Sequence, residues 1–139
     1  MAPRRSRIWL LVLSVIAAMV LTSCSALDPD LNLLRQEPMT SWTVPGVLSE
    51  VRSELPANPG GIVPNSAAII VRSLTFADED AAIAAQAAAG RAALEGGWQV
   101  SEREDGDISA LKQLRGQLSQ LGITRSSDDP QVVVISISI

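Results

Sequence analysis

The sequence predicts an α+β fold, in which a small antiparallel or mixed sheet packs against one main alanine-rich helix. Three observations predict it: residues 132–139 alternate like a half-buried strand, residues 78–95 are rich in alanine and precede Gly-Gly, and the prolines concentrate in residues 25–65. Alternation with a period of two is typical of strands, and closely spaced prolines block long helices and central strands. We therefore expect a signal peptide at 1–23, a proline-rich tether at 24–65 and an α+β domain at 66–139.

The first 24 residues have the layout of a secretory signal. Three arginines stand among the first seven residues, and the apolar segment from 8 to 21 is interrupted only by Ser14. A membrane-spanning helix needs about 20 apolar residues, so this segment is short for one. Asp28 and Asp30 follow it, where a stop-transfer signal would have basic residues. We expect residues 1–23 to be removed after export.

Leu21-Thr22-Ser23-Cys24 ends the apolar segment and contains the only cysteine of the chain. The motif resembles the lipobox of bacterial lipoprotein precursors. This resemblance implies cleavage between Ser23 and Cys24, and a diacylglyceryl group with fatty acyl chains such as palmitate on the Cys24 thiol. Two acyl chains hold a protein stably at a membrane, whereas one holds it only marginally. The resemblance thus implies a lipid-anchored protein on the extracytoplasmic face of the cell membrane. Cleavage after Ala26 and an uncleaved anchor are the alternatives.

The composition excludes several classes of site. The chain has no histidine and one cysteine, so internal disulfides, Cys/His zinc sites and mechanisms that need imidazole are excluded. Without the three arginines of residues 1–23, the formal net charge falls from −4 to −7, which argues against nucleic acid as a partner. We expect no metal and no cofactor. One lysine among eleven basic residues, with abundant alanine, is typical of high-GC genomes and suggests an actinobacterial source.

The proline-rich segment is expected to be structured in places. Residues 30–35 can form one helical turn, and Met39 and Trp42 form an apolar pair that we expect to dock on the domain. Residues 47–55 fit either a helix or an edge strand. Asn58-Pro59-Gly60-Gly61 predicts a loop.

The first clear strand spans 67–76, where Ile70, Leu74 and Phe76 fall on one face with Arg72 as the exception. The main helix is predicted over 78–95, because Asp78 can cap it and Gly96-Gly97 can end it.

A narrow apolar stripe is expected on this helix, formed by Ile83, Ala87, Gly90 and Leu94. Glycine costs about 1 kcal/mol against alanine inside a helix. We therefore expect Gly90 to mark a close approach of the helix to the sheet.

The remaining strands follow from alternation and turn signals. Residues 98–103 predict a strand, and residues 121–125 and 131–139 predict a hairpin around Ser127-Asp128-Asp129-Pro130. Residues 109–121 have two readings. Their leucines have helical spacing, but Gly116 suits a hairpin turn between two strands, and both interpretations stay open.

The order of strand, alanine-rich helix, Gly-Gly-Trp and further strands loosely resembles small actinobacterial lipoproteins of unknown function. The stretch from Pro38 to Trp42 adds to this likeness. The resemblance brings no active-site residues.

Three sequence patterns were weighed as catalytic or metal sites. Ser109-Ala110-Leu111-Lys112 matches the Ser-x-x-Lys motif of penicillin-binding proteins, but the Ser-Asp-Asn and Lys-Thr-Gly elements are missing from the sequence. Residues 102–107 are acidic, but only Asp105 fits an EF-hand loop counted from Gly106. Asp78-Glu79-Asp80 is explained by helix capping.

The sequence thus predicts a membrane-anchored envelope lipoprotein that is not an enzyme and that serves as an accessory or protein-binding module, with an envelope protein as partner. One alternative is a lipoprotein that binds a small ligand in a cleft between the segment of Met39 and Trp42 and the sheet. The other is a hydrolase that uses carboxylates, for which no constellation of residues can be named.

Overall fold

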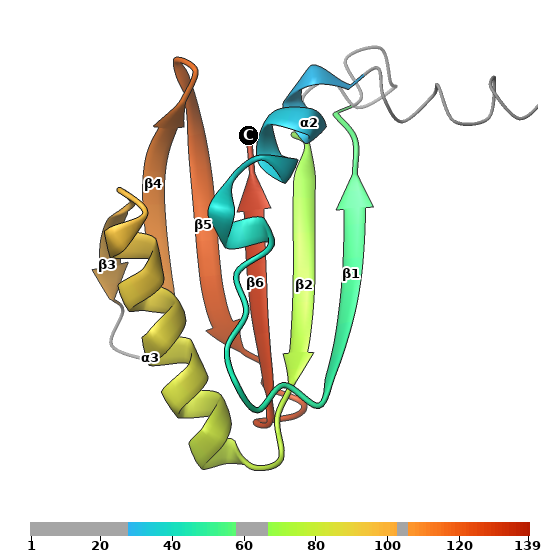
Figure 1. The fold of residues 1–139 in the computed structure, drawn as a ribbon, viewed down its shortest axis with the longest axis vertical. Helices are drawn as coiled ribbons and strands as arrows, with labels where there is room; N and C mark the ends of the chain where they lie inside the picture. The colour runs from blue at the N-terminus through green and yellow to red at the C-terminus, as the bar shows by residue number, and fades with distance from the viewer. Residues whose placement is uncertain (1–27, 58–66, 103–105) are drawn as a thin grey trace, which may run out of the picture.

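A computed structural model describes residues 28–57, 67–102 and 106–139. They form one six-stranded sheet in the order β1-β2-β6-β5-β4-β3, and every neighbouring pair is antiparallel. The fold is mostly sheet with one main helix, as the α+β prediction expected (Figure 1). The elements are α2 (Pro29–Arg35), the 3₁₀ helix η1 (Pro38–Thr40), β1 (Ser49–Leu55), β2 (Ile69–Thr75), α3 (Glu79–Glu95), β3 (Gln99–Glu102), β4 (Ile108–Leu114), β5 (Gln117–Arg125) and β6 (Val132–Ser138).

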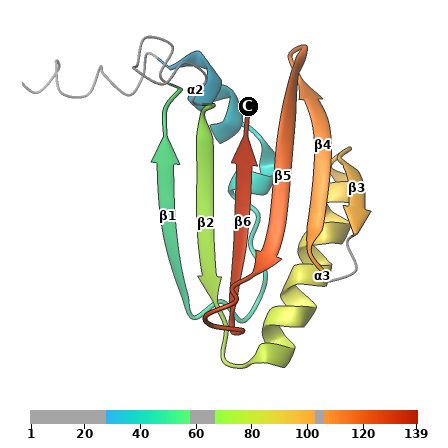
Figure 2. The same ribbon diagram turned by 180° about the vertical axis from the view of Figure 1, so that it is seen from behind.

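The helices lie on one face of the sheet. Figure 1 shows α3 across the half of the sheet formed by β3, β4 and β5, with α2 and η1 over the other half. In the view from behind, the strands lie in front and none of the described helices covers them (Figure 2). We call the face that carries the helices the covered face and the other the open face.

The core lies between the helices and the covered face. Ile70, Leu74 and Phe76 are buried in it, as predicted for the strand at 67–76. From β6, Val133 and Ile135 are buried in the same layer. The predicted β5–β6 hairpin is confirmed by the register.

Helix α3 begins and ends as the sequence predicts, but it buries a different face. The Asp78 carboxylate accepts a hydrogen bond from the Ala81 amide at 2.8 Å and caps the helix. The expected apolar stripe is wrong, because Ile83 and Leu94 are 44% and 57% exposed. The buried face consists of small residues and one amide: Ala82, Ala85, Gln86, Ala89, Gly90 and Ala93.

The small residues of α3 bring its axis close to the sheet. A Cβ placed on Gly90 would stand 2.7 Å from the Cδ1 of Ile108 in β4. Large side chains do not fit at that separation, so they point to solvent. The predicted close approach at Gly90 is confirmed.

Residues 109–121 are two strands and not a helix. Arg115 and Gly116 have φ angles of 49° and 86° between β4 and β5. Positive φ at both central residues is the mark of a tight hairpin turn that matches the twist of its strands. The helical spacing of the leucines arises by chance, because they belong to two different strands. They do not share one buried face: Leu111 and Leu118 are exposed, while Leu121 is buried. Residues 49–55 likewise form the edge strand β1.

The folded unit includes residues that we had assigned to the tether. Leu31, Leu34 and Met39 belong to the core, and β1 is part of the sheet. The predicted turn at 30–35 is the helix α2, and Met39 docks as expected. We call residues 28–48 the strap. The expected loop at Asn58–Gly61 and the lipobox at 21–24 lie outside the described residues.

Among the described residues, no helix is both long and apolar enough to span a membrane.

Candidate interaction surface

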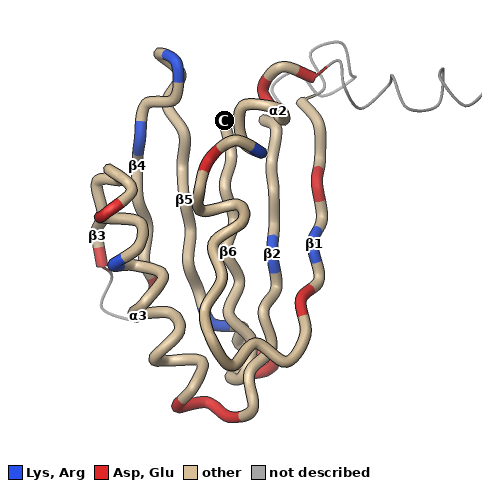
Figure 3. The backbone as a smooth tube through the Cα atoms, in the orientation of Figure 1, with Lys and Arg blue, Asp and Glu red and all other residues tan. Residues whose placement is uncertain are grey.

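The register of the sheet separates charged from uncharged side chains. Residues that pair directly across an antiparallel sheet point to the same side, so the register assigns every strand residue to a face. All charged residues of the six strands lie on the covered face: Glu50, Arg52, Glu54, Arg72, Glu102, Lys112 and Arg125. Figure 3 shows that β6, at the centre of the sheet, carries no charge. The open face therefore has no charged side chain on any strand.

Hydroxyl, amide and aliphatic side chains make up the open face. One cross-strand row runs the full width of the sheet through Ser53, Val71, Ser136, Gly122, Ser109 and Ser101. The flank formed by β1 and β2 is the more apolar one. Val51 and Leu55 are 66% and 58% exposed there, and Ile69 and Val71 are half-buried beside them.

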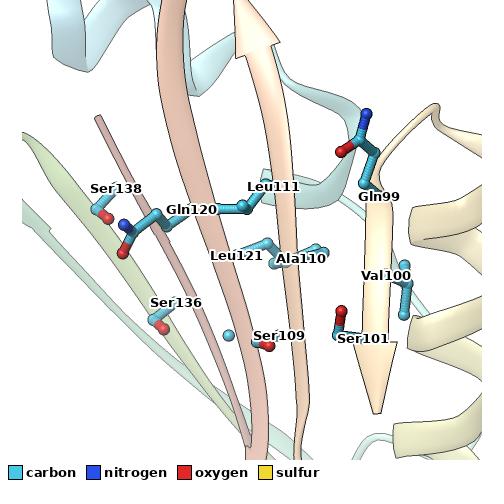
Figure 4. Close-up of a pocket in the computed structure, with 11 residues that line it drawn as sticks. Gln99, Val100, Ser101, Ser109, Ala110, Leu111, Gln120, Leu121, Ser136 and Ser138 are labelled. Atoms are coloured by element: carbon cyan, nitrogen blue, oxygen red, sulfur yellow. The ribbon is translucent and has the colours of Figure 1, made fainter.

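A hollow of about 440 Å³ lies on the other flank of the open face, over β3, β4, β5 and β6 (Figure 4). Gly122 forms part of its floor, and the Oγ of Ser136 stands 2.9 Å from where a Cβ of Gly122 would be. Its polar side chains are all uncharged: Gln99, Ser101, Ser109, Gln120, Ser136 and Ser138. The hollow offers hydrogen bonds to a neutral group and no charge to an ion.

The charges of the covered face bind the strap. Arg72 is only 2% exposed, and its guanidinium contacts the Glu50 carboxylate at 2.7 Å and 3.1 Å. It also donates to the strap carbonyls of Met39 at 3.2 Å and Trp42 at 2.6 Å. This explains the one exception in the apolar pattern of β2, because a buried arginine needs an anion and acceptors.

A buried carboxylate joins the strap to the other half of the sheet. Glu37 is 4% exposed and accepts hydrogen bonds from the Trp98 indole at 3.0 Å and from Lys112 at 3.0 Å and 3.2 Å. Lys112 also donates to the Gly96 carbonyl at 2.7 Å. Its Nζ lies 5.7 Å from the centre of the Trp98 ring, within cation–π range. The charged groups of the covered face thus have a structural use.

Acidic residues of β1 complete the attachment. The Glu54 carboxylate binds Arg35 of α2 at 2.6 Å and Arg52 at 2.8 Å. The hydrogen bond from Arg35 lowers the pKa of Glu54, and the hydrogen bond from Arg72 lowers that of Glu50. Both groups are therefore held as carboxylates below the pH at which a free glutamate takes up a proton.

The residues weighed earlier for catalysis do not come together. Ser109 and Lys112 lie on β4 and point to opposite faces, so they do not form a Ser–Lys pair. Asp78 caps α3, and Glu79 pairs with Arg125 at 2.9 Å. Over the described residues, no group of three or more acidic, cysteine or histidine side chains is placed to hold a metal. Ser23 and Cys24 lie outside the described part of the chain.

The two described tryptophans pack instead of forming an exposed platform. Trp98 is 2% exposed, and Trp42 is half-buried against the core. Where a ligand cleft was expected, between this segment and the sheet, Met39 is buried in the core and Arg72 donates to the carbonyls of Met39 and Trp42. The hollow lies on the opposite side of the sheet.

Comparisons of the chain with protein-family models, with curated proteins and with solved structures gave no match.

Proposed function

We propose that the protein is a lipid-anchored envelope protein without catalytic activity, which works by contact with another protein through its open face. The observation that supports the proposal is that every charged residue of the described strands lies on the covered face and none lies on the open face. Antiparallel sheets with one uncovered face usually place polar, solvated residues there. The centres of protein interfaces, by contrast, are depleted of charged residues.

The anchor in this proposal is Cys24, on the strength of the lipobox at 21–24. Three residues lie between Cys24 and Asp28, where the described fold begins, and the four Cα–Cα steps of an extended chain span about 14 Å. The domain would therefore stand close to the membrane. The strap would connect the anchor to the covered face of the sheet, so the open face would stay free for contact.

The anchor is tested by Cys24→Ala. We expect this variant to keep its signal peptide or to leave the membrane fraction, and Ser25→Ala is the matched control. Membrane fractionation with the mass of the mature chain is the measurement. If Cys24→Ala still matures to the wild-type mass in the membrane, Cys24 is not the anchor.

The contact surface is tested by Ser73→Glu, which places a charge on the open face without touching the core. Ala84→Glu, on the exposed side of α3, is the control. We expect crosslinking in intact membranes to recover partner proteins with wild type and with Ala84→Glu, but not with Ser73→Glu. Equal recovery from all three would overturn the proposal.

A second candidate function is the binding of a small uncharged ligand. The hollow of about 440 Å³ and its neutral polar lining favour it. Its test is the shift of the melting temperature with panels of neutral and charged metabolites. A shift with one neutral class, lost in Gly122→Val, would favour this candidate over protein contact.

A further inference from the structure

We infer that the partner on the open face is a second copy of the chain, and that two copies pack open face to open face about a two-fold axis parallel to the strands. The inference rests on the proposed function, since it names the protein that the open face contacts. It draws on the size of the face, its charge, its two unlike flanks and the end of the sheet from which the chain leaves.

The open face has the size of a protein interface. Six strands at about 4.8 Å and seven residues at about 3.3 Å give a face of about 670 Å² in projection. Side-chain relief adds to this, and a standard interface buries about 800 Å² on each partner. The open face of one copy therefore matches what a stable dimer needs.

Charge favours this face over the rest of the described surface for pairing like copies. The chain is acidic, so two copies repel each other wherever their carboxylates meet. No carboxylate lies on the open-face side of any strand. Two copies can approach there while the strand charges stay on the far side of each sheet.

The flanks of the face complement each other about an axis along the strands. Such an axis between β5 and β6 places β1 over β3, β2 over β4 and β6 over β5 of the other copy. The row from Ser53 to Ser101 then faces the same row of the other copy, which runs in the opposite direction across the sheet. Val71 on the apolar flank meets Ser109 at the hollow, and Ser136 meets the side-chain-free Gly122. Sheets that pack face to face keep their strands within about 30° of each other.

The membrane anchor selects the same axis. The strap enters at the end of the sheet where β6 ends and β2 begins, beside α2 (Figure 1). A two-fold axis along the strands keeps this end on the same side in both copies, so two anchors reach one membrane. An axis across the strands would send the two anchors in opposite directions.

Crosslinking of single cysteines tests the arrangement in the full chain at its native membrane. Ser53, Ser136 and Ser101 lie in the same row on β1, β6 and β3, so their positions differ across the sheet and not along it. Ser136→Cys lies beside the proposed axis. Position 53 of one copy, by contrast, lies about 24 Å across the sheet from position 53 of the other, at a strand spacing of about 4.8 Å. Ala84→Cys on α3 and the wild-type chain, whose Cys24 carries lipid in the proposal, are the controls.

With a short bis-maleimide, we expect Ser136→Cys to give a covalent dimer. Neither Ser53→Cys nor Ser101→Cys should give one alone. Two differently tagged copies, one with Ser53→Cys and one with Ser101→Cys, should crosslink to each other. Adding Ser73→Glu to Ser136→Cys should reduce the dimer about tenfold or more, because each new carboxylate would be buried without a partner against the uncharged face of the other copy. Membrane levels equal to wild type check that each variant folds.

Three results would overturn the inference. The first is a dimer from Ser53→Cys alone, which places the axis across the strands. The second is crosslinking of Ser136→Cys to a different protein without any dimer, which leaves the proposed function standing and removes the second copy. The third is no more dimer from Ser136→Cys than from Ala84→Cys. Failure of the proposed function is detected by a separate experiment, in which Ser73→Glu and Ala84→Glu recover partner proteins equally.

Discussion

Arg52 and Arg72 are direct partners across β1 and β2, with both guanidinium groups on the covered face. Like charges directly opposite each other destabilise a sheet. Each arginine is offset by its own carboxylate, Glu54 for Arg52 and Glu50 for Arg72, and each also donates to a carbonyl of the strap. The two arginines therefore hold the strap, and the strap carbonyls and the two glutamates offset the repulsion between the arginines.

Acid is expected to weaken this attachment. The pKa of Glu50 and that of Glu54 are lowered in the fold from an ordinary value of 4.5. A lowered folded-state pKa gives stability that is present above the unfolded value and lost as pH falls through the folded one. The free energy of unfolding from urea titrations should thus fall from about pH 5 to about pH 3. Glu50→Gln should have a shallower slope, and an unchanged slope would show that Glu50 is not responsible.

Arg72→Lys is expected to destabilise the fold by about 1–3 kcal/mol. An ammonium group keeps the charge, but it cannot contact the Glu50 carboxylate in two places and also reach the carbonyls of Met39 and Trp42. The matched control is Arg91→Lys on the exposed side of α3. Chemical unfolding measures the free energy of unfolding of both variants. Equal values would mean that the multiple hydrogen bonds of the Arg72 guanidinium do not stabilise the fold.

Glu37→Gln is expected to cost about 1–3 kcal/mol, because Lys112 loses its carboxylate. The amide oxygen can still accept from the Trp98 indole, so the tryptophan should stay buried. Urea unfolding followed by tryptophan fluorescence measures both effects. Glu95→Gln, at the exposed end of α3, should be nearly silent. A blue-shifted native spectrum together with a stability loss of about 1–3 kcal/mol would fit this assignment, and unchanged stability would contradict it.

Gly90 and Ile108 are expected to be energetically coupled. A methyl group on Gly90 would meet the Cδ1 of Ile108 at 2.7 Å, and Ile108→Val removes that atom. Gly90→Ala should therefore be better tolerated in the Ile108→Val background than in wild type, by about 0.5–3 kcal/mol. A double-mutant cycle of unfolding free energies measures this difference. Additive effects would mean that the helix can move away from the sheet at no cost.

The sequence predicts strands better than it predicts which face of the helix is buried. Alternation identified β2 and β6 because their buried residues are large and regularly spaced. The predicted stripe on α3 is wrong because large apolar side chains are not the buried ones on this helix. Gly90 and the alanines set the distance between helix and sheet, and at that distance Ile83 and Leu94 are the residues that cannot fit. The hairpin at 109–121 needed the backbone angles of Arg115 and Gly116 to distinguish it from a helix.

The candidate surface is harder to find in the sequence, because it is a property of the register. Within one strand, Glu50, Arg52 and Glu54 alternate with uncharged residues, which is an ordinary pattern. Only the pairing of six strands shows that all charged residues fall on one side. The buried polar groups depend in the same way on partners distant in sequence: Arg72 on strap carbonyls, and Glu37 of the strap on Trp98 and Lys112.

The division of charge between the two faces makes them respond to different solution conditions. The Arg35–Glu54 ion pair that joins the strap to β1 is part-exposed, so added salt should screen it and loosen the strap. The open face has no ion pair to screen, and its aliphatic contacts should be strengthened by sulfate and weakened by cooling. Ionic strength and temperature thus separate the stability of the domain from its association.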